Sequence, residues 1–343
     1  MLKQGGQKVK KSNRNKEKPE KKSFFHSEAA TSTIIGAVLL LGIIFSVFAI
    51  VRIGYVPEWK SDAECSHMND VYEDMADLKS KIDMMTVVLA SNPNSSYINS
   101  SNPSSYALQP IMTVPFHMGG GDVPFIGPIK SSGSLAVNKD NCIMGIVVRS
   151  PSGSMLYNKS LNCSTITYNS QNRYYINQNF SYECGALILD QGTQSVMTLY
   201  PSIRFSRTPN NKYNVSINAL RVFQKPYVPP QVISSNKGCS LRLTGLDYVR
   251  YYDSSKVAGE ISQLVLTVST THPEAWKQYL KGMVDDADIE PWDYSLTENK
   301  LNGVHFISLT FPSKLPSESS SKRLERVYLS ETVIKAEPGI GLS

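Results

Sequence analysis

The feature that most constrains this 343-residue chain is an uncharged apolar run of 23 residues, Ala29–Val51 (AATSTIIGAVLLLGIIFSVFAIV). As a helix that rises about 1.5 Å per residue, it reaches roughly 35 Å, enough to cross a hydrocarbon core of about 30 Å. A helix is required because a backbone in lipid must satisfy its own hydrogen bonds. Tyr55 and Trp59 follow, where aromatic rings favour the membrane interface. We therefore expect one transmembrane helix within residues 28–56, with the lipid bilayer as its partner.

The residues before this run, 1–27, are strongly basic. They hold nine Lys or Arg against two Glu, a net charge of +7, whereas the whole chain carries +6 and the remainder sums to −1. A Lys-rich run beside a membrane span usually sets topology rather than binding nucleic acid. We expect residues 1–27 as a cytoplasmic leader or tail, the C-terminal domain outside the cell and no nucleic-acid partner. A cleaved secretory signal is disfavoured because the following IVRIGYVPEWK offers no small-residue cleavage site.

A second helix is expected over 57–89. Pro57 and Glu58 suit a first helical turn, so a kink or restart near Val56 is expected. Apolar residues then recur at 3-4 spacing, as a heptad seam: Met68, Val71, Met75, Leu78, Ile82, Met85 and Leu89. The seam could pack on the chain's own domain or on other copies. The soft, adaptable methionines favour several non-identical surfaces, and we interpret the seam as a self-association surface on a stalk.

Residues 90–105 (ASNPNSSYINSSNPSS) lack apolar periodicity and read as a linker between stalk and head. Six N-x-S sequons all fall on the side expected to be outside the cell. Such sequons predict surface glycosylation in an exported domain. They open at Asn94, Asn99, Asn158, Asn162, Asn179 and Asn214.

Residues 106–343 read as one large β-rich, sandwich-like domain with one short helix. Short strands with turn signals between them predict this class. The expected strands are 142–149, 163–168, 184–190, 195–206, 213–223, 239–251, 260–269, 303–311 and 326–336. The helix is expected after Thr271, where Thr271 to Glu274 has the capping-box pattern. Trp276, Tyr279, Leu280 and Met283 form its apolar stripe, which we interpret as a lid on the core.

Five cysteines lie beyond the apolar run. Cys142, Cys163, Cys184 and Cys239 are spread over the β domain, where two disulfides with three possible pairings are expected. Cys65, just past the membrane segment, could be free or could link two chains; we expect it to be free because a lone Cys is a poor basis for a bond.

Catalytic and metal-binding patterns are nearly absent, so we expect no enzyme, no cofactor and no metal. No HExxH, CxxC or GxSxG occurs. The Gly run after His117 is expected to be a turn rather than an oxyanion loop, because no nucleophile motif accompanies it. The acidic residues of 285–290 lack the EF-hand order and fit a solvated loop.

A family resemblance follows from the start of the apolar run. Lys21-Lys22, Ser23, Phe24 and Glu28, followed by AATSTIIGAVLLLGIIF, look like the N-terminus of archaeal type IV pilins and archaellins. The resemblance covers about residues 20–60. It implies cleavage after Ser23 by a prepilin-type peptidase, Phe24 as the first mature residue and Glu28 as the fifth. It also implies that subunits leave the membrane and pack by their apolar helices, with Glu28 paired to the Phe24 ammonium of a neighbouring copy.

We therefore expect a pilin-like surface protein, a structural or minor subunit of a type IV pilus-like filament whose partners are its own copies or other pilin-like subunits. The alternative is a permanently anchored adhesin or receptor with a ligand-binding β-sandwich head. A buried carboxylate needs a partner, which a neighbouring ammonium would supply. In the alternative, Glu28 only meets the positive end of its own helix dipole.

Overall fold

The computed structural model describes residues 25–91, 109–120, 122–123, 126–129, 131–225, 227–257, 259–315 and 324–340, with side chains between 32 and 339. The chain forms two compact units, of which the first ends at Val56 and the second begins at Pro57. The processing residues Ser23 and Phe24 and the sequons at Asn94 and Asn99 lie outside the described residues.

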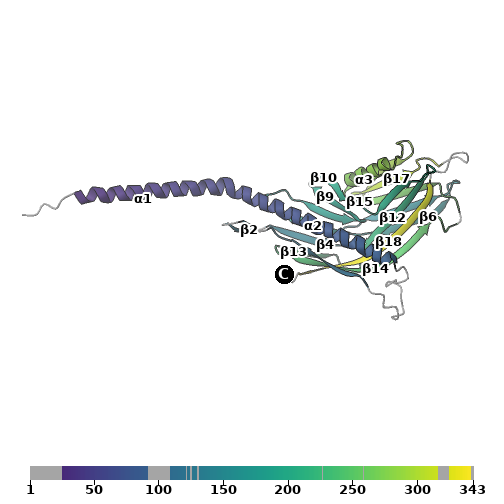
Figure 1. Cartoon of the computed structure of the whole chain (residues 1–343), viewed down its shortest axis with the longest axis horizontal. Coiled ribbons are helices and arrows are strands. Elements are labelled where there is room, and N and C mark those ends of the chain that lie inside the picture. Colours follow the sequence, from purple (N-terminus) through teal and green to yellow (C-terminus); the bar gives the residue numbers. More distant parts are fainter. Residues whose placement is uncertain are drawn as a thin grey trace, which may run out of the picture. The chain divides into compact units, whose positions relative to one another are not determined.

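The first unit is helical. Helix α1 spans Phe25–Ile50 and carries nearly all of the uncharged run (Figure 1). Its most apolar window has a mean hydropathy of 3.0, and none of that window is buried. Within the described part of the chain, this is the one helix long and apolar enough to cross a membrane. The predicted apolar N-terminal helix is confirmed; its placement in a membrane stays a prediction.

A π-helical turn, η1 (Val51–Tyr55), separates α1 from α2 (Val56–Ser91). The Val56 N–H donates to the carbonyl of Val51, five residues back. Pro57 has no N–H, so the carbonyl of Ile53 lacks its usual α-helical donor. A π-bulge is one way in which a helix absorbs such a loss. The predicted irregularity near Val56 thus takes the form of a widened turn just before it.

Three sheets and a short hairpin build the second unit. The first sheet has the strand order β1 (Ile111–Phe116), β14 (Cys239–Asp253), β18 (Leu324–Ile340), β12 (Tyr213–Val222), β11 (Ile203–Arg207). The second has the order β10 (Gln194–Leu199), β9 (Ala186–Gln191), β8 (Asn179–Glu183), β7 (Thr165–Gln171), β4 (Ser132–Val137), β13 (Gln231–Ser235). The third has the order β16 (Ser295–Leu301), β17 (Val304–Phe311), β15 (Gln263–Thr270), β5 (Ile143–Arg149), β6 (Met155–Asn162). The hairpin pairs β2 (Asp122–Val123) with β3 (Gly127–Pro128).

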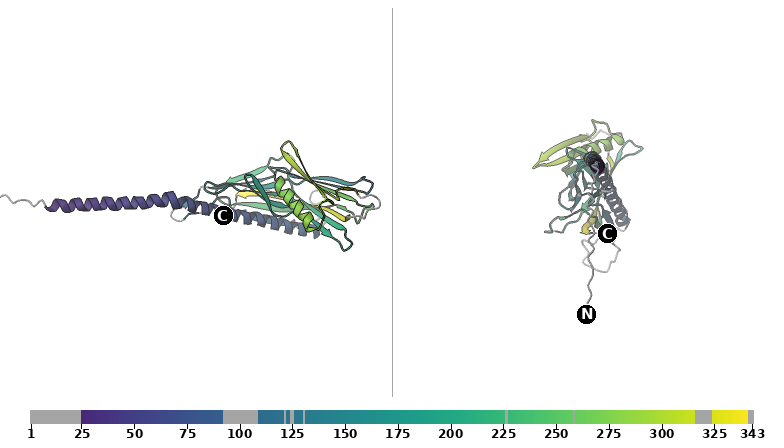
Figure 2. Two further views of the ribbon diagram at one scale, coloured as in Figure 1. Left: turned by 90° about the horizontal axis from the view of Figure 1, so that it is seen from above. Right: turned by 90° about the vertical axis from the view of Figure 1, so that its left-hand side faces the viewer.

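The first sheet contributes to two cores because its long strands pass from one layer to the next. Within it, β12 and β18 run parallel, from Tyr213 opposite Leu324 to Val222 opposite Ile334. One end of these strands packs against the third sheet and helix α3 (Pro273–Asp286). The other end packs against α2 and the second sheet. Figure 1 and Figure 2 show α2 running along β14 and β18 and α3 beside β17.

Helix α2 belongs to this β unit rather than forming a separate stalk. All seven seam residues, Met68 through Leu89, are at most 3% exposed. Six of them share a core with residues of the first and second sheets, among them Phe116, Tyr168 and Leu241. The interpretation of the seam as a self-association surface is therefore wrong, because the chain's own sheets already cover it.

The mainly β, sandwich-like class of the second unit is confirmed, with local corrections. The strand expected over 195–206 is two strands, β10 and β11, because Pro201 lies between them and they join different sheets. Helix α3 begins one residue later than the capping box implies. Its N-cap is His272, whose side chain makes no capping bond, and Pro273 occupies the first turn. The hydroxyl that accepts the His272 N–H belongs to Thr270, at 2.9 Å.

Candidate functional site

The apolar face of α1 is the largest uncovered hydrophobic surface among the described residues. Its Ile, Leu, Val and Phe side chains between Ile34 and Ile50 are each 42–64% exposed. Gly36 and Gly42 have open space where a Cβ would stand. Ser46 makes a bond within the helix, from its Oγ to the Gly42 carbonyl at 2.8 Å. Exposure of so much apolar surface to water is energetically unfavourable, so we expect lipid or another apolar helix to cover it.

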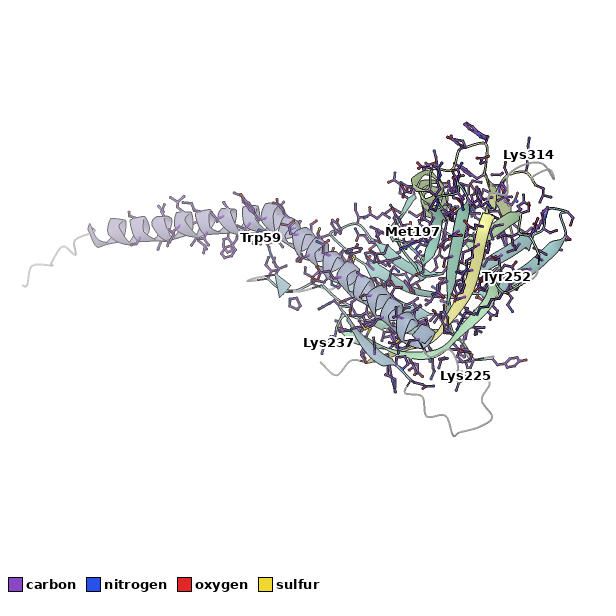
Figure 3. The ribbon with its side chains drawn as sticks, turned by 45° about the vertical axis from the view of Figure 1, so that its right-hand side comes forward. Trp59, Met197, Lys225, Lys237, Tyr252 and Lys314 are labelled. Carbon is purple, nitrogen blue, oxygen red and sulfur yellow. A yellow bond between two sulfur atoms is a disulfide. The ribbon has the colours of Figure 1, made fainter. Side chains whose placement is uncertain are left out.

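A buried carboxylate fixes the N-terminal part of α2 to the β sheets of the second unit. Glu64 is fully buried and accepts the backbone N–H groups of three consecutive residues: Arg173 at 3.0 Å, Tyr174 at 2.7 Å and Tyr175 at 2.8 Å. Successive N–H groups that converge in this way form an anion-binding nest, here filled by the chain's own side chain. Lys60 adds a cation–π contact, with Nζ 4.9 Å from the centre of the Tyr174 ring. Figure 3 labels Trp59, one residue before Lys60, at this end of α2.

A second clamp lies further along α2. Asp74 Oδ2 accepts the His117 N–H at 2.7 Å and lies 2.9 Å from His117 Nδ1. Burial raises the pKa of the Asp74 carboxyl, and the hydrogen bonds from His117 only partly offset that rise. One heptad before Asp74, the His67 ring lies 3.3 Å from the Tyr168 hydroxyl, and burial lowers its pKa.

The Gly run after His117 passes close to neighbouring backbone, as expected of a turn. A Cβ on Gly119 would collide with the backbone of Asn236, and one on Gly120 would meet the Ser131 hydroxyl. The Gly120 N–H instead donates to Ser131 Oγ at 2.8 Å. Gly119 and Gly120 therefore let the chain pass close to α2 and to the residues that flank the second sheet.

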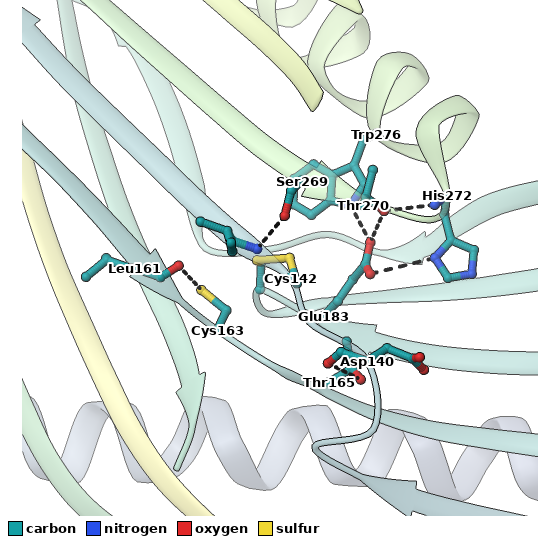
Figure 4. Close-up of a disulfide and its surroundings, with 12 residues drawn as sticks. Asp140, Cys142, Leu161, Cys163, Thr165, Glu183, Ser269, Thr270, His272 and Trp276 are labelled. Atoms are coloured by element: carbon teal, nitrogen blue, oxygen red, sulfur yellow. Dashed lines mark hydrogen bonds and ion pairs between the residues drawn. A yellow bond between two sulfur atoms is a disulfide. The ribbon is translucent and has the colours of Figure 1, made fainter. Parts of the chain in front are cut away.

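Helix α3 is tied to the second sheet by another buried carboxylate, Glu183 at the end of β8 (Figure 4). The Thr270 hydroxyl and the Trp276 Nε1 each donate to its Oε1 at 2.6 Å. The His272 Nδ1 lies 3.7 Å from its Oε2. Burial by itself lowers the pKa of His272, but Glu183, with smaller contributions from Asp190 and Asp140, raises it above the ordinary value.

The cysteines form one disulfide instead of the two expected. Cys142 is joined to Cys184, next to Glu183 (Figure 4). Cys163 and Cys239 are free and buried, and they belong to different cores, which explains why they do not pair. Burial raises the pKa of the Cys163 thiol strongly and that of Cys239 to about 11, so both thiols are inert. Cys65 is free and partly exposed.

The four described sequons differ in accessibility. Asn158 and Asn162 are exposed on β6, the outer strand of the third sheet. Asn179 and Asn214 are half-buried, on β8 and β12, each of which has a neighbouring strand on both sides. The positions on β6 therefore offer the better attachment sites. Glu28 lies within the first turn of α1.

A cavity of about 480 Å³ lies between α3 and strands β10 and β11. Its walls are mainly apolar and aromatic, with Phe205, Tyr279 and Met283 among them, and Arg204 and Asp286 are the charged residues in its described lining. This composition suits binding rather than acid–base chemistry. Nowhere in the described ranges do three His, Cys, Asp or Glu side chains gather as a metal site would require.

No protein family, curated protein or solved structure matches this chain. Two features of the described residues bear on its function. Helix α1 is apolar and uncovered, and α2 is fixed to the β head by several buried polar groups.

Proposed function

We propose that this chain is a pilin-like, membrane-anchored surface protein, a subunit of a type IV pilus-like filament. The observation that carries the proposal is the contrast between the two helices. The apolar seam of α2 packs against the chain's own sheets, whereas the apolar side chains of α1 have no cover among the described residues. Other copies can therefore pack on α1, but not on the α2 seam.

The clamps on α2 support a load-bearing role. A subunit that associates through one helix must transmit force from that helix to its head. The chain enters α2 after the π-helical turn that follows α1, and α2 is fixed by Glu64, by Asp74 and by its seam. Many buried contacts along one element raise the free energy needed to detach it locally. Such a base fits a structural subunit better than it fits a freely hinged receptor.

The charges around α1 complete the proposal. In the uncut chain the +7 tail stays in the cytoplasm, and its charge opposes burial in a filament core. Cleavage after Ser23 removes this obstacle and creates an ammonium on Phe24. By resemblance to archaeal pilins, that ammonium pairs with Glu28 of a neighbouring copy.

Glu28→Gln tests the role of this carboxylate. We expect normal cleavage and membrane accumulation but failed or misregistered filaments, because the amide cannot pair with an ammonium. Glu58→Gln, an exposed acidic residue in the first turn of α2, is the matched control and should assemble normally. If Glu28→Gln filaments are indistinguishable from wild type, the carboxylate only caps its helix, a role that contributes about 0.3–1 kcal/mol.

The alternative, a permanently anchored adhesin or receptor, draws on the cavity of about 480 Å³ beside α3. That volume lies in the range of small-ligand sites. The two functions differ in whether the native chain keeps residues 1–23.

A further inference from the structure

A second cavity, of about 300 Å³, lies where the three sheets meet. The chain leaves β6 of the third sheet, crosses the end of β12 of the first sheet and enters β7 of the second. The Val222 N–H donates to the Cys163 carbonyl at 2.8 Å and fixes this crossing. Polar residues of the lining come from the crossing between β6 and β7, from the end of β12 and from the loop after β12: Asn162, Ser164, Arg221, Gln224, Lys225 and Tyr227. Figure 3 labels Lys225 at the edge of the head.

Tyr227 occupies an unfavourable backbone conformation at the rim of this cavity. The Val228 N–H donates to the Lys225 carbonyl at 3.2 Å, which closes a β-turn with Tyr227 at its third position. Its φ is +64°, a value that favours Gly at this place in a turn and disfavours a bulky residue. The tyrosine side chain nevertheless points wholly into solvent, with a relative exposure of 105%. Strain of this kind clusters at binding sites, because folding alone gains nothing from it.

The rest of the lining combines polar residues with Val222 and Val228, and its cations are Arg221 and the exposed Lys225. Arg221 Nε lies 3.1 Å from Glu331 Oε1 as an ion pair, although the two atoms are not aligned for a hydrogen bond. The Tyr251 hydroxyl donates to the other carboxylate oxygen at 2.8 Å. Because Glu331 already meets the charge of Arg221, the cavity does not concentrate enough positive charge to select a phosphate. Amides and hydroxyls that can both donate and accept dominate instead.

We propose that this cavity is a saccharide-binding site, with Tyr227 as its stacking platform. A sugar ring offers hydroxyls that both donate and accept, and flat C–H faces that pack on an aromatic ring. Asn162 and Gln224 supply the matching amides, and Ser164 lies buried in the floor. Asn162 also opens an N-C-S sequon, so the saccharide has two sources: an N-glycan attached at Asn162 itself, or a glycan from outside the chain. This site does not depend on filament formation.

The test uses the full-length chain in a detergent without a sugar headgroup. Saturation-transfer NMR measures binding of N-acetylglucosamine, galactose, mannose and glucuronic acid, each added alone, to the chain produced in a host without N-glycosylation, which leaves Asn162 intact and the cavity free of an attached glycan. Tyr227→Gly and Tyr227→Phe are then placed in this background. We expect Tyr227→Gly to melt at a higher temperature, because Gly relieves the positive φ, yet to bind the responsive sugar at least about tenfold more weakly. Tyr227→Phe keeps the ring and should bind within about threefold of its parent, a difference under 1 kcal/mol.

The source is read from the glycosylated chain. If the glycosylated chain rejects the sugar that the unglycosylated chain binds, the attached glycan fills the cavity; if both bind it, the saccharide comes from outside. Either result supports the site. No response from the unglycosylated chain to any of the four sugars, or equal binding by Tyr227→Gly, would overturn it.

Discussion

At the scale of single residues, buried carboxylates fix helices and strands of the head to one another. Glu64, Glu183 and Glu331 are each at most 2% exposed, and each accepts hydrogen bonds from groups distant in sequence. A buried charge without such partners destabilises the folded state, so the fold depends on each of these carboxylates keeping its hydrogen-bond donors. The stability of the head therefore depends on single polar side chains as well as on apolar ones.

Glu64→Gln should destabilise the head by about 2–4 kcal/mol, because an amide nitrogen would face N–H donors where a carboxylate oxygen accepted them. Urea unfolding followed by circular dichroism measures the loss. Glu73→Gln, exposed on the same helix, is the matched control and should stay within about 0.5 kcal/mol of wild type. Equal midpoints for the two variants would mean that the nest contributes nothing to stability.

The His272–Glu183 pair predicts a stability contribution that depends on pH. The pKa of His272 is raised in the folded chain, so the folded state holds a proton that the unfolded state releases. The stabilisation is fully present below about pH 6.5, the unfolded value, and is lost as pH rises through the folded pKa. The difference in unfolding free energy between wild type and His272→Gln should therefore shrink from pH 6 to pH 8.5. In a Glu183→Gln background this decrease with pH should disappear, because burial alone lowers the pKa of His272. In the wild-type background, a difference that grows with pH would contradict the pairing.

None of these polar contacts could be predicted from the sequence. Glu64 and Glu73 look alike in a charged helix, and only the loop at 173–175 distinguishes them. The same holds for the sequons, where the N-x-S pattern is identical but the strands around Asn158 and Asn179 differ. Tyr227 carries a weak local signal, since a Tyr follows Lys-Pro where a Gly would suit the turn.

At the scale of elements, α2 joins two layers of the head. Its seam lies between the first and second sheets, and its exposed large apolar side chains lie near its two ends: Trp59 at the start, and Met84, Val87 and Val88 in the last turns. The 3-4 spacing correctly indicates a buried stripe, but spacing alone does not say what covers it. A heptad seam on a sheet and one on a second helix have the same sequence pattern.

Leu78→Ala should cost the head about 2–5 kcal/mol, the usual range for truncating a fully buried leucine. Val87→Ala removes apolar atoms from a side chain that is 70% exposed and should change stability by less than about 0.5 kcal/mol. Thermal melts of the purified full-length chain compare the two. If Leu78→Ala leaves the melt unchanged and only alters association, the seam lies between copies after all.

The strand predictions were more complete in the middle of the sheets than at their edges. Central strands such as β5, β12 and β15 carry continuous or alternating apolar residues that mark them. The overlooked strands include two interior ones, β4 and β8, and four that are outermost in their sheets, β1, β6, β13 and β16. The sequences of outermost strands such as β6 and β16, MLYNKSLN and SLTENKL, are polar because one side faces water.

At the scale of the whole molecule, the two units contribute different parts of the proposed function. The first unit supplies an apolar helical surface, and the second supplies a head whose internal contacts are complete without any other copy. The apolar helix and the β class follow from composition and periodicity. The function rests on the resemblance over residues 20–60 and on the uncovered face of α1, so it turns on how the native N-terminus is processed.

The intact mass of the native protein, with N-terminal sequencing, tests this most directly. We expect a chain that begins at Phe24, with Glu28 as its fifth residue, in both membrane and filament fractions. The glycan mass is removed enzymatically before comparison, so that it does not mask the loss of 23 residues. A native chain that still carries residues 1–23 would contradict the filament subunit and leave the permanently anchored receptor in its place.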